Sequence, residues 1–256
     1  MKMPVLFIGH GSPMNILAQN DFTQSLKNIA NKIPEPKAIL CISAHWTTKN
    51  EIFIHKNTSS KLIYDFYGFP DKLYNIQYPA LGCPELANLI AKNILMVQTI
   101  QERGLDHGSW SILHHIYPKA NIPIIQLSID MNKNELFHYD LGQQLKFLRK
   151  EGYLIIGSGN LTHNLKMVDW KNQTNQPSYD WVQDFDKEFQ KLMKDKNYQK
   201  LTFYRHIPGA ENGIQNPDHY FPFLYCLGAA GNSSFEYIYE GFELGTLNMR
   251  SILWKD

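Results

Sequence analysis

The chain has 256 residues, of which 43% are hydrophobic and 19% are charged, and its formal net charge is +1. This composition is ordinary for a soluble globular protein, and the balanced charge gives no sign of a nucleic-acid or membrane partner bound through charge. The length suits one large domain, so we expect a single domain over residues 1–256. No apolar run reaches the roughly 18 residues of a transmembrane helix, and the N-terminal run is too short for a signal peptide.

Cysteine usage agrees with an intracellular protein. Cys41, Cys83 and Cys226 are scattered along the chain, odd in number, and form no CxxC pair. Neither a disulfide framework nor a cysteine zinc site is therefore indicated. We expect reduced, buried thiols and a cytoplasmic location.

Apolar runs alternate with amphipathic stretches along the whole chain. In chain order, the pattern predicts a strand at 4–9, a helix at 21–31, strands at 37–43 and 51–55, helices at 83–95 and 110–117, a strand at 122–129, a helix at 132–152, a strand at 153–159, helices near 178–194 and 217–229, and strands at 235–243 and 246–254. This alternation is typical of an α/β fold. We expect three layers, with a largely parallel central sheet flanked by helices. The sheet should be mixed, because the last two strands follow each other closely enough to pair as a hairpin.

Three histidines follow predicted strands. His10 stands between two glycines after the first strand, His45 follows the second strand, and His163 comes just after the 153–159 strand. Ligands of open α/β sheets bind beyond the carboxyl ends of the strands. The glycines on either side of His10 allow a tight turn and a close approach of the backbone to a ligand. We therefore expect these histidines to converge on one edge of the sheet.

A cluster of neutral imidazoles suits zinc, iron, copper or nickel, whereas magnesium prefers carboxylates. The chain has no HExxH motif, no phosphate-binding GxxxxGK[ST] loop and no GxSxG elbow, so a zinc protease, a nucleotide hydrolase and a serine hydrolase are not indicated. The remaining histidines have no strand-end placement and are expected to be structural: His55, His114, His115, His138 and His206. Of these, His138 falls in a helical pattern and is expected to be solvated or partly buried.

Six motifs carry a resemblance to a known family. The segments "GHGSPMN", "SAHW", "DHGSW", "QLSID", "GSGNLTHNL" and "NPDHYFPFLYCLGAAG" occur in this order in the class III extradiol ring-cleavage dioxygenases. The chain most resembles the bacterial and plant 4,5-DOPA dioxygenase extradiol group, over roughly residues 3 to 254. The resemblance implies one catalytic α/β domain with a mixed sheet.

The resemblance also implies the residues of the site. The family's metal ligands fall on His10, His45 and His219, and His163 lies beside the metal, where relatives use it as a ligand or as an acid/base. His107 lines the substrate side, so His163 and His107 are the expected catalytic residues. Better-known relatives use two histidines and a glutamate, whereas this sequence has His219 in place of that carboxylate. The expected cofactor is one divalent metal ion per chain, Zn²⁺ or Fe²⁺, and an oxygenative reaction would require iron because zinc does not change valence.

The implied function is the opening of a catechol ring, such as that of DOPA, with O₂ to give a muconic semialdehyde. The expected partners are therefore a small catechol and O₂, and the chain is expected to be a monomer or a small homo-oligomer. Two alternatives stay open at this point: a zinc-dependent hydrolase or lyase acting on a small aromatic or carbonyl compound, and a metal-binding protein without enzymatic activity.

Two further local expectations concern the surroundings of the site. His219 should lie in the first turn of its helix, with Asn216 as N-cap and Pro217 at the first helical position. Several aromatic side chains could either stack on a substrate ring or simply pack in the core: Trp46, Tyr64, Phe66, Trp110 and Tyr220.

Overall fold

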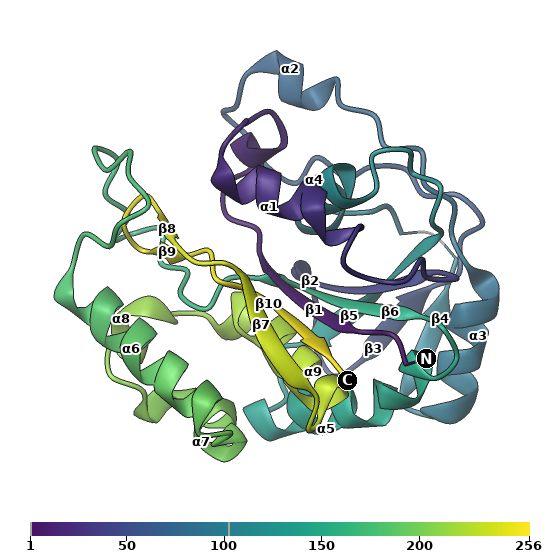
Figure 1. The fold of residues 1–256 in the computed structure, drawn as a ribbon. Helices are drawn as coiled ribbons and strands as arrows, with labels where there is room; N and C mark the ends of the chain where they lie inside the picture. The colour runs from purple at the N-terminus through teal and green to yellow at the C-terminus, as the bar shows by residue number, and fades with distance from the viewer. Residues whose placement is uncertain (1, 102) are drawn as a thin grey trace.

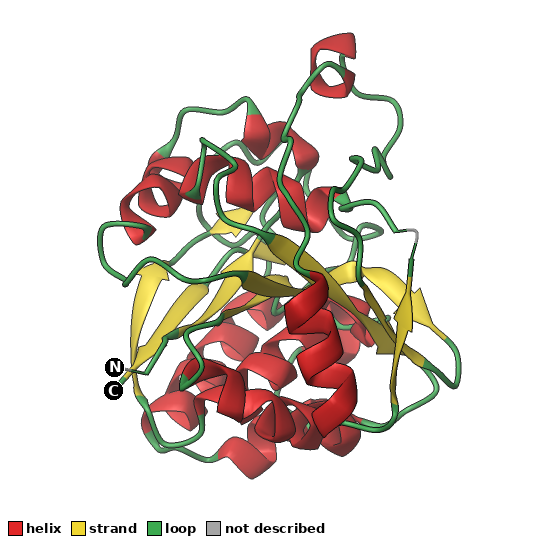
Figure 2. Ribbon diagram, turned by 90° about the vertical axis from the view of Figure 1, so that its right-hand side faces the viewer, coloured by secondary structure: helices red, strands yellow, loops and turns green. Residues whose placement is uncertain are grey.

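A computed structural model describes residues 2–101 and 103–256, and in this part of the chain one mixed sheet lies between two layers of helices (Figures 1 and 2). The sheet has the strand order β4-β3-β5-β2-β6-β1-β10-β7. The strands are β1 (Val5–Gly9), β2 (Ile39–Thr48), β3 (Ile52–His55), β4 (Val97–Ile100), β5 (Ile124–Asp130), β6 (Leu154–Gly159), β7 (Ser234–Tyr239) and β10 (Ser251–Lys255). A separate two-stranded sheet consists of β8 (Phe242–Glu243) and β9 (Leu247–Asn248).

The parallel centre of the sheet sets the position of the site. Strands β1, β6, β2 and β5 are neighbours and run parallel, with Gly9 opposite Gly159 and Ser43 opposite Ser158. Their carboxyl ends therefore meet at one edge. Strand β3 is antiparallel to β5, and β10 is antiparallel to both β1 and β7. The mixed, largely parallel sheet expected from the sequence is thus confirmed.

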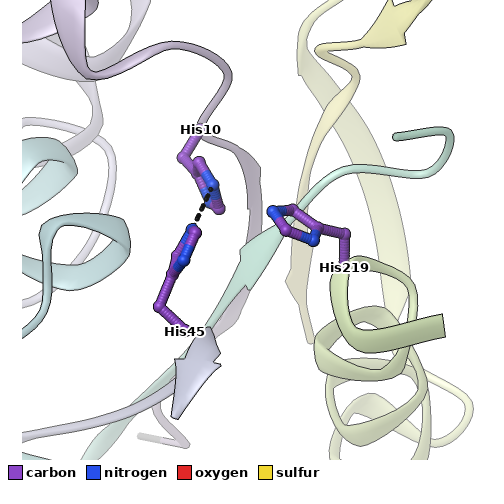
Figure 3. Close-up of side chains that lie close together, drawn as sticks. All are labelled: His10, His45 and His219. Atoms are coloured by element: carbon purple, nitrogen blue, oxygen red, sulfur yellow. Dashed lines mark hydrogen bonds between the residues drawn. The ribbon is translucent and has the colours of Figure 1, made fainter. Parts of the chain in front are cut away.

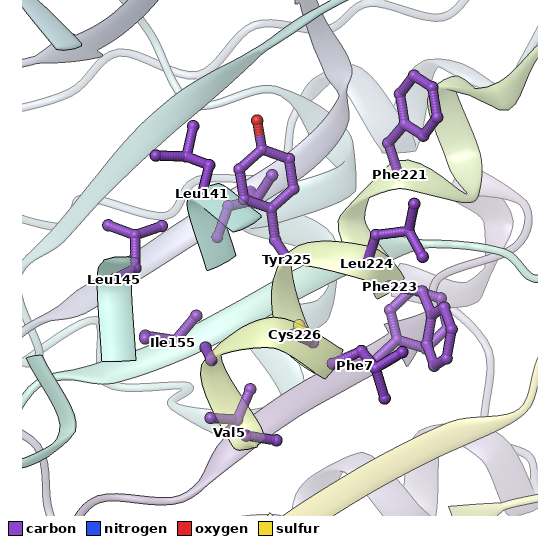
Figure 4. Packing of buried hydrophobic residues seen from close by; sticks show 14 of the residues in the cluster. Val5, Phe7, Leu141, Leu145, Ile155, Phe221, Phe223, Leu224, Tyr225 and Cys226 are labelled. Atoms are coloured by element: carbon purple, nitrogen blue, oxygen red, sulfur yellow. The ribbon is translucent and has the colours of Figure 1, made fainter. Parts of the chain in front are cut away.

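Alternation along the strands sends side chains into two separate cores. On β1, Leu6 and Ile8 pack with α1 (Asp21–Ile29) and α4 (His107–Ile116), whereas Val5 and Phe7 pack with α5 (Glu135–Leu145) and α9 (Phe221–Ala230). Figure 4 shows the second of these cores, where side chains of α5 and α9 lie over β1 and β6. The other helices are α2 (Asp71–Tyr74), α3 (Pro84–Asn93), α6 (Asp180–Lys194), α7 (Tyr198–Thr202) and α8 (Ala210–Gly213). The three-layer arrangement follows from a sheet that is apolar on both faces.

Several element boundaries differ from the sequence predictions. The strand predicted at 37–43 continues to Thr48, and the helix predicted at 132–152 gives way to a 3₁₀ turn at Lys146–Arg149. Strand β4 and the short helices α2, α7 and α8 were not predicted, because four- or five-residue elements carry too little periodicity to stand out.

The two strands predicted at the chain end are each interrupted. Their outer parts, β7 and β10, do pair antiparallel as expected, but β8 and β9 fold back between them as a small hairpin. Its turn contains Leu244 and Gly245, both with positive φ, at 50° and 67°. The hairpin takes the chain away from the main sheet and leads it back at Met249, next to the end of β1.

In the described residues, no helix combines the length and the apolar character needed to cross a bilayer. All three cysteines are free within the same residues, and Cys41 and Cys226 are buried as expected. Cys83 differs from the expectation because it is only partly buried, at the N-cap of α3.

Candidate metal centre

His10 leaves the sheet directly after β1, and its neighbours explain the two glycines. Its backbone N–H donates to the carbonyl of Gly159 at 2.9 Å, which ties it to the end of β6. A Cβ on Gly9 would lie 2.6 Å from the backbone carbon of Met249, so the returning chain leaves no room for a side chain there. Gly11 has φ of +60°, a conformation that glycine adopts without strain.

His45 lies within β2 and not after it, which corrects the sequence prediction. Ile42 pairs with Leu127 of β5 but Thr47 pairs with Ile129, so β2 holds extra residues between these two pairs. Such a bulge re-aims the side chains that it carries. The sequence prediction ended this strand too early. The pairing with β5 that extends β2 is a tertiary contact, which the local sequence pattern does not reveal.

His219 reaches the same edge from the opposite side, in the 3₁₀ turn Pro217–His219 that precedes α9. Asn216 is the N-cap of this turn and Pro217 its first residue, as expected, but the Asn216 side chain makes no capping bond, and α9 itself begins only at Phe221. The turn lies against β6, since a Cβ on Gly159 would collide with the carbonyl oxygen of His219.

The three imidazoles converge (Figure 3). One ring nitrogen of each of His10, His45 and His219 lies within 4.8 Å of the others, and the Nε2 atoms of His10 and His45 are 3.1 Å apart. A tetrahedral zinc ion with Zn–N bonds of about 2.0–2.1 Å holds its ligand nitrogens about 3.4 Å apart. The observed spacing is therefore close to that of a metal site.

Hydrogen bonding on the far side of two of the three rings indicates which nitrogen faces inward. Ser158 gives its only hydroxyl proton to the carbonyl of Gly108, so its Oγ accepts from Nδ1–H of His10 at 3.0 Å. Asp218 Oδ1 accepts from Nδ1–H of His219 at 2.9 Å. In the neutral rings Nε2 then carries a lone pair.

The inward lone pairs fit a cation. Nε2 of His219 is buried and has no hydrogen-bond partner, and an unpaired buried acceptor costs free energy. A divalent ion between His10, His45 and His219 would satisfy all three lone pairs at once. The donor set of three imidazoles suits zinc and also iron(II).

Burial keeps these rings neutral, as metal ligation requires. Desolvation lowers the pKa of His10 and of His219 well below 6.5, and the neighbouring histidines lower both further. Desolvation, with a further contribution from His107, lowers the pKa of His45 to about 3. The buried rings therefore present lone pairs and not protons at neutral pH.

The structure brings His163 to the site but outside the three-histidine group. Its ring stacks on that of His219, with centroids 3.5 Å apart and planes 3° from parallel. Among the described residues, the groups with metal-ligand spacing do not include His163. Desolvation lowers its pKa to about 4, so it is neutral at pH 7.

His107 is the first residue of α4 and lies on the other side of His45, with ring centroids 4.0 Å apart. The buried carboxylate of Asp106 caps this helix by accepting from the backbone N–H of Ser109. Asp106 also accepts from Ser43, Gln126 and Arg103, and burial raises its pKa. This network fixes the start of α4 beside β2.

The five other histidines are not in the groups with metal-ligand spacing among the described residues. His138 is a correction to the sequence analysis, because it is fully buried. Its ring stacks on Phe221 with centroids 4.0 Å apart and lies 3.1 Å from the hydroxyl of Tyr225. His138 lies on α5, which packs against α9. The helix face that was expected to be solvated is therefore a helix–helix interface.

Two of the five aromatic candidates, Tyr220 and Trp110, belong to the core. The hydroxyl of Tyr220 donates to the backbone carbonyl of Leu201, and its ring packs on Tyr204. Trp110 is fully buried. Phe66 is different, because its ring meets that of His107 edge-on with centroids 5.5 Å apart. A role in lining the substrate side is compatible with the position of Phe66 alone among these three.

Sequence reasoning missed the acidic and hydroxyl partners of the histidines. Asp218 and Ser158 lie inside motifs that were singled out for their histidines and glycines, so adjacency could have suggested them. Asp65 lies in the loop between β3 and α2, 3.0 Å from Nδ1 of His107 and 3.5 Å from Nδ1 of His45. No sequence pattern marks it, since its partners are distant in the chain.

Comparisons with known proteins agree with the geometry. Residues 4–249 match the family described as the catalytic LigB subunit of aromatic ring-opening dioxygenase. The chain is 37% identical to the 4,5-DOPA dioxygenase extradiol of Escherichia coli (strain K12), over 98% of this chain and 94% of the relative. It is also 37% identical to the 4,5-DOPA dioxygenase extradiol of Beta vulgaris, over 96% of this chain and 94% of the relative.

A solved structure shares the fold. The crystal structure of an uncharacterized protein from Escherichia coli K12 superposes with a TM-score of 0.85 at 35% sequence identity, covering 99% of this chain and 100% of the other. The family match extends over nearly all of the sequence, which confirms the resemblance carried by the six motifs. The chain therefore belongs to the LigB family of aromatic ring-opening dioxygenases and is an extradiol ring-opening enzyme.

Proposed function

We propose that the protein opens a catechol ring with O₂ at one divalent metal ion held by His10, His45 and His219. The observation that carries this proposal is the convergence of one ring nitrogen from each of His10, His45 and His219 at the sheet edge of a chain that belongs to a ring-opening dioxygenase family. Iron(II) bound there would supply both a Lewis acid and a redox-active centre, whereas zinc would supply only the first.

The relatives favour a DOPA-like substrate, because two of them at 37% identity are named 4,5-DOPA dioxygenase extradiol. The product would be a muconic semialdehyde that contains both atoms of O₂, so the reaction needs no external reductant. The three neutral imidazoles bring no negative charge to the site, which favours binding of an anionic catecholate. The side chains of His45 and Asp65 are 21% and 24% exposed, so access from solvent is expected on their side.

Two histidines flank the proposed ligands and are proposed to move protons. His107, whose Nδ1 lies 3.0 Å from Asp65, is proposed to accept a catechol hydroxyl proton at Nε2. His163, parallel to His219, is neutral at pH 7 and is the second candidate for proton transfer. Positioned histidines suit both the uptake and the return of a proton near neutral pH.

Anaerobic reconstitution tests this function. Metal-free protein is loaded with iron(II) or with zinc, a panel of catechols that includes DOPA is added, and O₂ uptake is measured beside the absorbance of the yellow ring-opened product. We expect one O₂ consumed per catechol opened with iron, no uptake with zinc, and no uptake by His10→Ala treated in the same way. Zinc-dependent turnover of an ester or carbonyl compound, without O₂ uptake by the iron form, would overturn the proposal in favour of a hydrolase or lyase.

A further inference from the structure

One carboxylate outside the sheet faces two histidines of the site. Asp65 accepts from the backbone N–H of His107 through Oδ1 at 2.9 Å. The same oxygen lies 3.0 Å from Nδ1 of His107, and Oδ2 lies 3.5 Å from Nδ1 of His45. Nδ1 of His107 is buried and has no aligned hydrogen-bond partner, so this carboxylate is the nearby acceptor toward which its N–H can turn. The hydrogen bond from the backbone of His107 thus holds the carboxylate where one of its oxygens is close to the ring of His107 and the other is close to the ring of His45.

We infer that Asp65 is a positioning residue that turns His45 and His107 so that each presents Nδ1–H to the carboxylate and Nε2 to the centre of the site. The inference rests on the proposed function, since it assigns a role in the same metal centre. Asp65 would not touch substrate or metal and would act through the two imidazoles.

The strongest support is that Asp65 completes a pattern. Nδ1 of His10 has Ser158 as its partner, and Nδ1 of His219 has Asp218. Within the described residues, the polar contact found for Nδ1 of His45 is the one with Asp65. Metal-binding histidines in proteins usually donate their second ring N–H to such a partner, which fixes the tautomer and the ring orientation.

The same contacts join the two sides of the site. The ring centroids of His45 and His107 lie 4.0 Å apart and the ring planes are 47° from parallel, so the two rings are in contact. Phe66, the next residue after Asp65, packs edge-on against His107. The loop between β3 and α2 therefore holds a proposed metal ligand and a proposed acid/base through two adjacent residues.

A second cation is the alternative explanation of the cluster. His45, Asp65 and His107 do have donor atoms within 4.8 Å of one another. However, Oδ1 already accepts the backbone N–H of His107 at 2.9 Å, and Nδ1 of the same residue lies 3.0 Å from that oxygen, although its ring N–H is not aligned with it in this structure. In the proposed orientation the Nδ1 atoms of His45 and His107 carry protons and have no lone pair for a metal, so the metal count of the protein separates positioning from a second ion.

The test uses Asp65→Asn, which keeps the shape but replaces one acceptor oxygen by an NH₂ group that cannot accept a ring N–H. The matched control is Asp71→Asn, an exposed carboxylate at the start of α2. Zinc affinity is measured on the full chain by competition with a chromophoric chelator, and ¹⁵N spectra of the histidine rings are recorded on the zinc-loaded protein. Neither measurement involves substrate, so a failure of the proposed ring cleavage would not be mistaken for a failure of this inference.

We expect zinc to bind about 10- to 100-fold more weakly to Asp65→Asn, with altered Nδ1 signals of His45 and His107, and no change in Asp71→Asn. If Asp65→Asn does not fold, Asp65→Ser is measured instead, with the same expected loss. Unchanged affinity together with unchanged ring spectra would overturn the inference. A fall from two bound zinc ions to one, with the first site intact, would also overturn it by making Asp65 a ligand of a second ion.

Discussion

At the scale of single residues, His163 differs from the three proposed metal ligands, because its ring lies beside theirs and does not point at the centre of the site. His10, His45 and His219 have Nε2 atoms facing one another, whereas His163 stacks flat against His219 at 3.5 Å. Removing His163 therefore removes a candidate base and also a packing partner of a proposed ligand. A test of its role has to separate these two effects.

His163→Phe keeps a flat ring against His219 but cannot carry a proton, and His163→Ala removes both. We expect both variants to keep most of their metal and to lose turnover by about 10²–10⁴-fold, the usual contribution of a positioned acid/base. His10→Ala should instead lose the metal. Metal content by elemental analysis and O₂ uptake are measured on all three variants. Metal-free His163→Phe protein would make His163 a ligand and leave His107 as the acid/base candidate.

At the scale of elements, the position of His10 depends on a segment from the other end of the chain. Glu243 of β8 accepts from the backbone N–H of Ser12 at 2.8 Å and from the amide of Asn15 at 2.9 Å. A Cβ on Gly11 would collide with that carboxylate and with the side chain of Met249. The β8–β9 hairpin thus clamps the turn that carries His10.

Gly11→Ala should be more damaging than the same change at Gly68. Both glycines have positive φ, at 60° and 76°, which costs an alanine about 1–2 kcal/mol. A Cβ on Gly68 meets nothing within 4 Å, whereas one on Gly11 meets Glu243 and adds about 1–3 kcal/mol for overpacking. Urea unfolding and zinc affinity are compared for the two variants. Equal losses of stability at the two positions, with zinc binding intact, would show that the clamp does not matter.

Much of this architecture could be predicted from the sequence, and the failures share one cause. The strands and helices of the sheet core have strong periodicity, and the motifs located His10, His45 and His219. The extension of β2, the short β4 and the partnership of Asp65 with His107 depend on contacts between segments far apart in the chain. Local pattern carries no record of such contacts, so these features became visible only in the fold.

At the scale of the whole molecule, buried histidines link stability to pH. Burial lowers the pKa of both His55 and His138 from 6.5 to about 4, and both lie in the interior outside the candidate site. The unfolded chain takes up a proton on each of them below about pH 6.5, while the folded chain resists doing so until about pH 4. Stability is therefore full above about pH 6.5 and falls as the pH drops toward 4.

The contribution of His138 can be isolated with His138→Gln, which keeps a hydrogen-bonding group next to Tyr225 and does not titrate. A pKa lowered from 6.5 to about 4 corresponds to a loss of up to about 3 kcal/mol between pH 7 and pH 4. We expect the metal-free variant to lose less stability than the wild type over this range, by up to that amount. Urea unfolding at pH 7, 6, 5 and 4 measures the difference, and parallel curves for the two proteins would contradict the account.

The central claim is that His10, His45 and His219 hold one metal ion through Nε2, and anomalous diffraction from crystals of the zinc-loaded protein tests it most directly. Data collected on either side of the zinc absorption edge locate the ion without reference to activity. We predict one peak per chain, about 2.0–2.1 Å from the three Nε2 atoms, with His163 and His107 outside its coordination sphere. A peak bound to His163 in place of any of the three, or one centred between His45, Asp65 and His107, would contradict the account.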